Sequence, residues 1–205
     1  MNAPHQDMEV IVDTGVPGLF LVKQFLSEEE EQTLAELIDA GSWKMNRSNT
    51  RRVQMYGPWH DSKYQVKKGC IVTPLPSFAA PLAQKIKQVT EDHFPQFDLT
   101  DYHMGEDKYT ELFINEYKPE DSLQFHFDHR STYKEVIFGV SLLSDAYLFF
   151  SRGKTQAKVA IPRRSLYLMT GPSRTAWKHG MLPGTLSNDG AKRYSLTFRH
   201  VNYCC

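Results

Sequence analysis

Cysteine is scarce in this chain of 205 residues: it occurs only at Cys70 and at the adjacent positions Cys204 and Cys205. Adjacent cysteines rarely bridge each other, so no disulfide framework is predicted and a reducing compartment is expected. Cys204 and Cys205 could accept a lipid or join a metal site, and a tail without function is the simpler alternative.

Long apolar runs are missing as well. No run approaches the length of a membrane span, and the N-terminus lacks the basic start and the apolar middle of a signal peptide. We therefore expect no membrane partner, and a location in the cytoplasm or the nucleus.

An excess of either charge is also absent, because 24 Lys and Arg balance 24 Asp and Glu. Charge is uneven along the chain, however. Residues 27–39 carry only acidic charges, whereas residues 44–68 carry seven basic residues and a single acidic one, Asp61. Such a basic segment suits a polyanion, and a solvated loop is the alternative.

Length and apolar patterning predict a single domain over residues 1–205. Residues 27–40 and 77–89 have apolar side chains at helical spacing, and Ser27 with Glu30 forms a capping-box pattern. After about residue 109 helices disappear, and short strands are expected at 111–117, 123–129, 136–142, 146–151, 157–161, 165–169 and 193–201. The prediction is a β-rich α+β domain: a double-stranded β-helix (jelly roll) over about 109–201 with helices packed on one sheet face.

Residues 42–76 break both periodicities, since Arg, Asn, Gly and Pro alternate there with aromatic residues. A long loop or a ragged hairpin is expected. Long loops in compact domains are usually functional or mobile.

A possible metal site follows from the alternation of side chains in strands, where residues two apart share a face. His126 and Asp128 therefore point the same way, and His179 follows downstream. Two imidazoles and one carboxylate can hold Fe(II) by one face and leave the other face open for a co-substrate and O₂.

A possible anion site lies in two other strands. Asn115 and Tyr117 share one strand face, and Arg193, Ser195 and Arg199 share another. An interior lined by such residues is costly to bury empty, and a guanidinium offers a paired-donor fork to a carboxylate. The two arginines are separated by roughly 20 Å of strand, which their inward-reaching side chains would shorten to fit a short dicarboxylate. A dicarboxylate that also chelates iron through a keto acid group is 2-oxoglutarate.

Each part of this pattern has a simpler explanation. An H-x-D triplet often arises by chance, and a histidine before a glycine is often a loop or core residue. The arginines could form a solvated strand face. Order, spacing and shared facing together favour the iron and 2-oxoglutarate interpretation.

Six segments together strongly resemble the AlkB family of Fe(II)/2-oxoglutarate dioxygenases, namely Asn115–Pro119, His126–Asp128, Pro162–Leu166, Gly171–Arg174, Trp177–Gly180 and Arg193–Arg199. The similarity covers nearly the whole chain from about Phe20, and Arg51–Gly57 looks like the substrate lid of eukaryotic members. The lid is accordingly expected at about 42–76. Pro162–Gly180 looks most like the AlkB domain of the transfer-RNA wobble-uridine hydroxylase. That protein's additional RNA-recognition and methyltransferase domains have no room here, so its substrate is not carried over.

The resemblance implies a role for each matching position. The iron ligands would be His126, Asp128 and His179. The residues addressing 2-oxoglutarate would be Asn115, Tyr117, Arg193, Ser195 and Arg199. Among these, Arg193 would pair with the distal carboxylate with support from Tyr117, while Asn115 and Arg199 would address the end near the metal. Ser195 replaces an Asn that some members carry.

The activity implied is oxidative demethylation or hydroxylation of alkylated nucleobases in RNA or DNA, with Fe(II), 2-oxoglutarate and O₂. The target base would stack on aromatic residues and be read along its pairing edge. Substrate candidates are Arg51, Arg52, Tyr56 and Trp59, with Trp43 also considered for stacking. Two alternatives stay open: a dioxygenase acting on a protein side chain or a small metabolite, and a catalytically silent RNA-binding module of the same fold.

Overall fold

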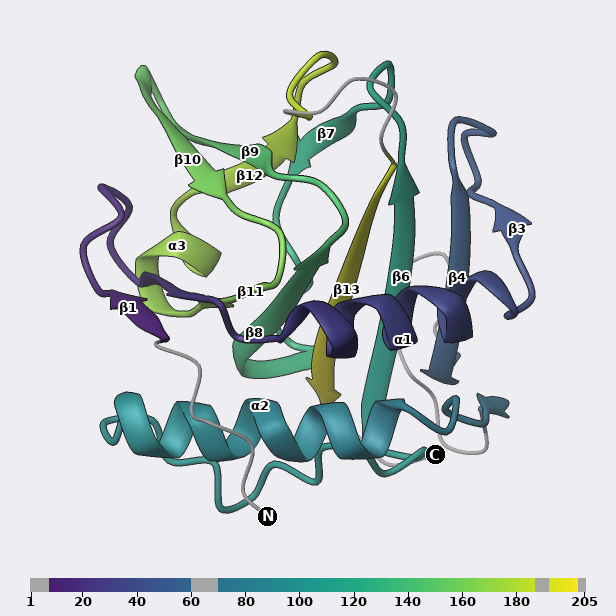
Figure 1. Cartoon of the computed structure of the whole chain (residues 1–205). Helices are drawn as coiled ribbons and strands as arrows, with labels where there is room; N and C mark the ends of the chain where they lie inside the picture. The colour runs from purple at the N-terminus through teal and green to yellow at the C-terminus, as the bar shows by residue number, and fades with distance from the viewer. Residues whose placement is uncertain (1–7, 60–69, 187–191, 203–205) are drawn as a thin grey trace.

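The computed structural model describes residues 8–59, 70–186 and 192–202. The elements, shown in Figure 1, are β1 (Glu9–Ile11), β2 (Leu19–Lys23), α1 (Glu28–Asp39), β3 (Lys44–Met45), β4 (Arg52–Pro58), β5 (Val72–Thr73), α2 (Ala79–His93), β6 (Thr110–Tyr117), β7 (Leu123–His126), β8 (Tyr133–Leu142), β9 (Ala146–Arg152), β10 (Thr155–Ile161), β11 (Ser165–Met169), α3 (Gly171–Thr175), β12 (Lys178–Met181) and β13 (Arg193–Val201).

The strands form two antiparallel sheets. The large sheet has the order β1-β2-β11-β8-β13-β6-β4-β3, with β5 paired to β4, and the small sheet has the order β10-β9-β12-β7. Side chains from both sheets share one apolar cluster, including Tyr117 and Tyr167 from the large sheet and Phe150 and Met181 from the small one. The sheets therefore face each other, and the prediction of a β-rich jelly roll is confirmed.

Helix α1 begins as its sequence predicts. The Ser27 hydroxyl accepts a hydrogen bond from the Glu30 amide at 3.0 Å, and the Glu30 carboxylate accepts one from the Ser27 amide at 2.7 Å. This capping box satisfies two amides that a helix start would otherwise leave unpaired. The helix buries Leu34 and Ile38 against the large sheet.

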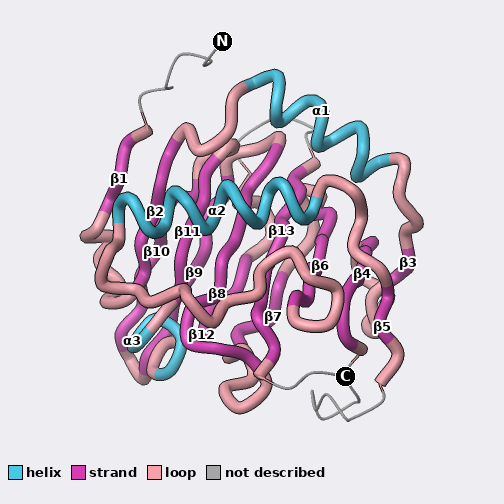
Figure 2. Tube along the Cα trace, turned by 90° about the horizontal axis from the view of Figure 1, so that it is seen from below, coloured by secondary structure: helices cyan, strands magenta, loops and turns pink. Residues whose placement is uncertain are grey.

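Helices α1 and α2 cover the same face of the large sheet (Figures 1 and 2). Alternation in β13 separates the two faces: Leu196 and Phe198 join the apolar cluster with the helices. Arg193 and Arg199 point the opposite way, toward the small sheet, and pair in register with Tyr117 and Glu111 of β6. The central strand therefore carries core residues on one face and polar site residues on the other.

Residues 42–76 contribute more regular structure than the pattern indicated. β4 pairs with β6 in the large sheet, with Val53 opposite Asn115, and β3 pairs with β4. Four charged residues of the predicted basic segment, Asp61, Lys63, Lys67 and Lys68, lie outside the described residues.

Cys70 is disulfide-bonded. A single bond is not the disulfide framework that the sequence argued against, but the sequence did not predict it. Adjacency argued only against a bridge between Cys204 and Cys205 themselves. Cys70 packs against Tyr133 and Val201, where segments distant in sequence meet.

No helix in the described part of the chain is both long enough and apolar enough to cross a membrane.

Candidate active site

The three predicted iron ligands converge. His126, Asp128 and His179 each offer a ligand atom, and these atoms all lie within 4.8 Å of one another. The His126 and His179 ring centres are 4.4 Å apart, and Nε2 of His179 lies 3.7 Å from Oδ2 of Asp128. His126 is half-buried and the other two are buried. Two imidazoles and one carboxylate that converge in this way would occupy one face of a metal ion. This is the 2-His-1-carboxylate arrangement that suits non-haem Fe(II).

A β-bulge aims the two histidines at each other. His179 pairs with His126 and Met181 with Leu123, so two residues of β7 oppose Gly180 alone. The bulge lets Leu123 and His126, three positions apart, both face the interior. A Cβ at position 180 would lie 2.6 Å from the Leu123 carbonyl oxygen, so this register requires glycine.

Asp128 lies just beyond the end of β7, because the strand stops at His126 rather than reaching residue 129 as predicted. One of its oxygens, Oδ1, accepts from Arg199 Nη2 at 2.7 Å. The other, Oδ2, is buried and has no hydrogen-bond partner among the described residues. A buried carboxylate oxygen without a partner is costly, and a cation between it and the histidines would satisfy it.

The protonation states around this point suit metal binding. Nδ1 of His126 lies 2.8 Å from the Gln124 carbonyl oxygen, a contact that requires a proton on Nδ1 and leaves the lone pair on Nε2. Burial alone would raise the pKa of Asp128, but Arg199 and the two histidines lower it to about 2. Burial lowers the pKa of His179 to about 4, although Asp128 opposes the shift. At neutral pH the site therefore offers the Asp128 carboxylate and a neutral His179 imidazole, the forms of these groups that bind metal.

Arg199 is held by a second carboxylate. Its Nη1 donates to Glu111 Oε1 at 2.6 Å, and the Tyr133 hydroxyl donates to Glu111 Oε2 at 2.8 Å. Arg199 thus bridges Glu111 and the iron ligand Asp128. This network fixes the direction of the Asp128 carboxylate.

Arg193 lies deeper in the same interior and is fully buried. Its Nε donates to the Ser141 hydroxyl at 2.9 Å and its Nη1 to the Met181 sulfur at 3.4 Å. Its Nη2 has no partner, and no carboxylate pairs with it within the described part of the chain. Because a buried cation without a counter-charge is strongly unfavourable, the site fits an anionic ligand.

The other residues predicted to address 2-oxoglutarate lie beside Arg193. Tyr117 is opposite Arg193 and Asn115 is opposite Ser195 in the β13–β6 register, so all four share the interior face. The Arg193 guanidinium carbon lies 5.6 Å from the centre of the Tyr117 ring. Burial raises the pKa of Tyr117, although Arg51 and Arg193 oppose the shift. The phenol therefore stays protonated and able to donate to a carboxylate.

Arg51, one of the substrate candidates, reaches this same group. Its Nε donates to Asn115 Oδ1 at 2.8 Å, and its Nη1 lies 3.4 Å from the Ser122 carbonyl oxygen. Its guanidinium carbon is 5.1 Å from the Tyr117 ring centre, so Tyr117 contacts two cations. Arg51 links the segment expected to be the lid to the residues expected to bind the co-substrate.

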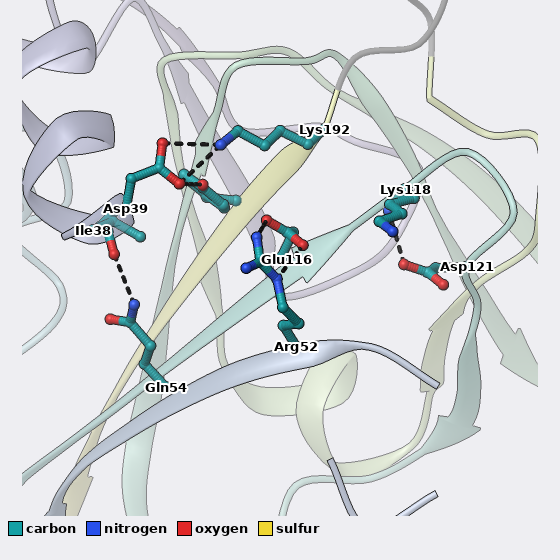
Figure 3. A network of polar contacts seen from close by, with 9 residues as sticks. Ile38, Asp39, Arg52, Gln54, Glu116, Lys118, Asp121 and Lys192 are labelled. Atoms are coloured by element: carbon teal, nitrogen blue, oxygen red, sulfur yellow. Dashed lines mark hydrogen bonds and ion pairs between the residues drawn. The ribbon is translucent and has the colours of Figure 1, made fainter. Parts of the chain in front are cut away.

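Arg52 points to the opposite face of the sheet. It pairs with Glu116 at 2.5 and 2.8 Å and lies over the Trp43 ring, next to α1, as Figure 3 shows for the ion pair. Strand alternation therefore separates Arg51 from Arg52, which were expected to act together.

Of the two aromatic substrate candidates, Tyr56 lies on the helix-covered face of the large sheet and Trp59 is exposed. The Tyr56 hydroxyl donates to Gln54 Oε1 at 3.0 Å, and Tyr56 packs against the cluster beneath the helices. Trp59 follows β4 and is 55% exposed. Arg52 and Tyr56 thus lie on the helix-covered face of the large sheet, whereas Arg51 contacts Asn115 and Tyr117 on the face of the site.

Sequence reasoning did not single out Glu111, Tyr133 or Ser141. The sequence could have indicated Glu111, since it lies on the same face of β6 as Asn115 and Tyr117. Tyr133 and Ser141 gave none, because they lie in an apolar strand whose facing only the sheet pairing reveals.

Comparison with known proteins supports the assignment of this cavity as an iron and 2-oxoglutarate site. Residues 18–199 match the 2OG-Fe(II) oxygenase superfamily. The chain is 32% identical over 176 residues to the mouse tRNA (carboxymethyluridine(34)-5-O)-methyltransferase ALKBH8, covering 82% of this chain but 24% of that protein. It is 28% identical to an uncharacterized mimivirus protein, L905, over 90% of this chain and 85% of the viral one. A DNA N6-methyl adenine demethylase of Caenorhabditis elegans is 26% identical, over 91% of this chain and 60% of that protein.

Solved structures share the fold. OsALKBH1 superimposes with a TM-score of 0.64 at 18% identity, covering 89% of this chain and 98% of that structure. A prolyl-4-hydroxylase from Pseudomonas putida gives 0.56 at 18% identity, covering 91% and 93%. With the converging triad and the buried arginine, these matches identify the chain as an AlkB-like member of the 2OG-Fe(II) oxygenase superfamily.

Proposed function

We propose that this enzyme oxidatively demethylates or hydroxylates alkylated nucleobases in RNA or DNA. The observation that carries the proposal is an iron site of this composition in an AlkB-like chain. Two relatives support the substrate class: one is named for its action on tRNA and another as a DNA N6-methyl adenine demethylase. Both are longer than this chain, so the choice of base is not carried over.

One group of side chains would bind the metal, and a second group would bind the co-substrate. When bound, iron and 2-oxoglutarate supply the oxidation of a substrate C–H bond by O₂, coupled to loss of CO₂ from the co-substrate. His126, Asp128 and His179 would hold the metal, and Arg199 keeps Asp128 charged and oriented. The protein's share is orientation and the exclusion of unproductive oxidation.

The second group of residues would receive 2-oxoglutarate. Arg193 Nη2 is the unpaired donor available to the distal carboxylate, and Tyr117 is the neutral donor beside it. Asn115, Ser195 and Arg199 continue the same face toward the metal. This order would place the keto acid end at the triad and the far carboxylate in the interior.

The substrate would approach beside His126, the most exposed of the three ligands. Bases inside a duplex cannot reach such a site, so the target base must be extruded or come from a single strand. Arg51, which contacts Asn115, would lie next to the entering nucleotide.

Mass spectrometry of nucleosides tests the proposal. The enzyme would be incubated with Fe(II), 2-oxoglutarate, mixed cellular RNA and alkylated DNA, and every modified nucleoside would be measured before and after. Loss or hydroxylation of at least one modified nucleoside is expected, together with succinate, and neither is expected from His126→Ala. Succinate formation without change in any nucleoside, but with oxidation of an added peptide mixture, would contradict the nucleobase assignment.

A further inference from the structure

The outer face of the small sheet carries aromatic rings, each next to a cation. We call this group the cation–aromatic stripe, and it consists of Phe127, Arg130, Tyr147, Phe149, Lys158 and Lys178. It lies on the reverse side of the sheet that holds His126 and His179 and is separate from the cavity described above. No residue of it was among the site candidates.

One end of the stripe adjoins the iron ligands. Phe127 stands between His126 and Asp128 in sequence and is 38% exposed. The Arg130 guanidinium carbon lies 5.3 Å from the centre of its ring, and the Lys178 ammonium nitrogen lies 5.9 Å from the same point. Both cations are exposed. These distances are those of cation–π contacts.

The other end lies on β9 and β10. The Lys158 ammonium nitrogen is 3.8 Å from the centre of the Tyr147 ring and 6.0 Å from that of Phe149. Both rings are half-buried, so each keeps a surface that another molecule can contact.

Strand register makes these two ends continuous. Lys158 is opposite Phe149, and Phe149 is opposite Gly180 of β12, two residues beyond Lys178. The stripe therefore crosses β10, β9 and β12 in their sheet order and ends at Phe127 and Arg130, which follow β7. With neighbouring strands about 4.8 Å apart, it extends over about 15 Å.

Charge along this part of the chain is one-sided. Residues 146–186 contain seven Lys and Arg and no Asp or Glu, although the chain as a whole is balanced. Arg163 and Arg164 pair with Glu31 and Glu28, and Arg174 is buried against backbone carbonyls. The remaining cations are exposed and have no ion-pair partner in the described ranges: Arg152, Lys154, Lys158 and Lys178.

Lysines alone would suit any polyanion, but alternating rings and cations suit a more specific partner. Unstacked nucleobases bind aromatic faces, and phosphates bind the cations between them. An acidic peptide would satisfy the lysines and leave the rings without a partner. We propose that the stripe binds the single-stranded nucleic acid that flanks the target nucleotide, outside the cavity. This inference rests on the proposed function, since it presupposes a nucleic-acid substrate.

The test measures binding of a fluorescent single-stranded RNA of 15 nucleotides by anisotropy at several salt concentrations. Lys158→Glu and Lys178→Glu are each expected to weaken binding at low salt by about fivefold or more and to lower the salt slope by about one. Lys87→Glu makes the same charge change on α2, on the far side of the large sheet, and is expected to bind within twofold of the wild type.

A second variant tests the rings. Phe149→Leu keeps an apolar side chain and removes the stacking surface, so binding of the RNA should weaken several-fold. Thermal unfolding of every variant shows that each remains folded.

The outcomes separate the two proposals. If Lys158→Glu and Lys178→Glu bind RNA as Lys87→Glu does, the stripe has no such role while the proposed function stands. If polyglutamate displaces the RNA as well as unlabelled RNA does, and Phe149→Leu binds normally, the stripe serves an acidic protein and the inference is overturned. If the wild type binds neither RNA nor single-stranded DNA, the proposed function itself fails.

Discussion

His126 and His179 face each other from neighbouring antiparallel strands, with ring centres 4.4 Å apart. This relationship depends on the bulge opposite Gly180, because a regular strand would turn either Leu123 or His126 away from the interior. The iron site is thus set by a local irregularity in a short strand.

Gly180→Ala is expected to weaken the metal site without changing a ligand. The added Cβ would meet the Leu123 carbonyl oxygen at 2.6 Å, so β7 must shift. Crowding of this kind costs about 1–3 kcal/mol of stability. Isothermal titration with Co(II) should show at least tenfold weaker binding. Gly184→Asn, at an open turn where asparagine tolerates the positive φ of 71°, serves as the control. Unchanged Co(II) affinity in Gly180→Ala would show that the bulge is not required.

Arg193→Met should separate stability from co-substrate binding. The wild-type guanidinium is fully buried without a carboxylate partner among the described residues, so removing it should leave the ligand-free protein as stable or more stable. The rise in melting temperature that 2-oxoglutarate gives the wild type should disappear. Arg193→Lys keeps a charge but loses the fork, and should retain a small part of that rise. Strong destabilisation of ligand-free Arg193→Met would mean that another anion already neutralises this arginine.

Arg51→Ala and Arg52→Ala should have different effects although the residues are adjacent. Loss of the Arg51 contact to Asn115 should raise the KM for 2-oxoglutarate several-fold in succinate assays. Arg52→Ala breaks a partly exposed ion pair with Glu116 and should cost about 1 kcal/mol of stability with little change in that KM. Equal KM values in the two variants would contradict the placement of Arg51.

His200 should make the protein less stable in mild acid. Burial, with further contributions from Lys134 and His103, lowers its pKa from 6.5 to about 4. Between pH 6.5 and pH 4 the His200 imidazole is protonated in the unfolded chain but neutral in the folded chain. The free energy of unfolding therefore decreases as the pH falls below 6.5. Lowering the pH from 7 to 5 should cost about 2 kcal/mol through this residue.

Urea unfolding at pH 7 and pH 5 checks the effect of His200. Replacement by Phe, which can still pack on Tyr102 and Tyr109, should remove most of the difference between the two pH values. Parallel losses in both proteins would assign the acid sensitivity to other groups, with His179 the next candidate.

The sequence was sufficient for the features that strict periodicity controls. The capping box at Ser27 and the shared face of Arg193 and Arg199 follow from spacing alone, and both are present. The three metal ligands also converge as predicted. Features that depend on pairing between strands could not be predicted from the sequence. Nothing in the order of Arg51 and Arg52 shows that a sheet strand begins there and sends them to opposite faces.

Two further features could not be predicted from local sequence patterns, because they depend on which segments meet in the fold. The bond of Cys70 depends on which distant segments meet in space. The cation–aromatic stripe draws its members from β9, β10, β12 and the segment that follows β7, which are far apart in sequence. The sequence lacks acidic residues from 146 to 186, but this bias alone does not show which of the cations there lie beside aromatic rings.

β13 is bonded on both sides, to β6 and to β8, along almost its whole length. A single residue inserted between Arg193 and Arg199 would turn one of these arginines into the apolar layer beneath α1 and α2. Homologous genes should therefore tolerate insertions in the turns of this domain while keeping that interval at constant length.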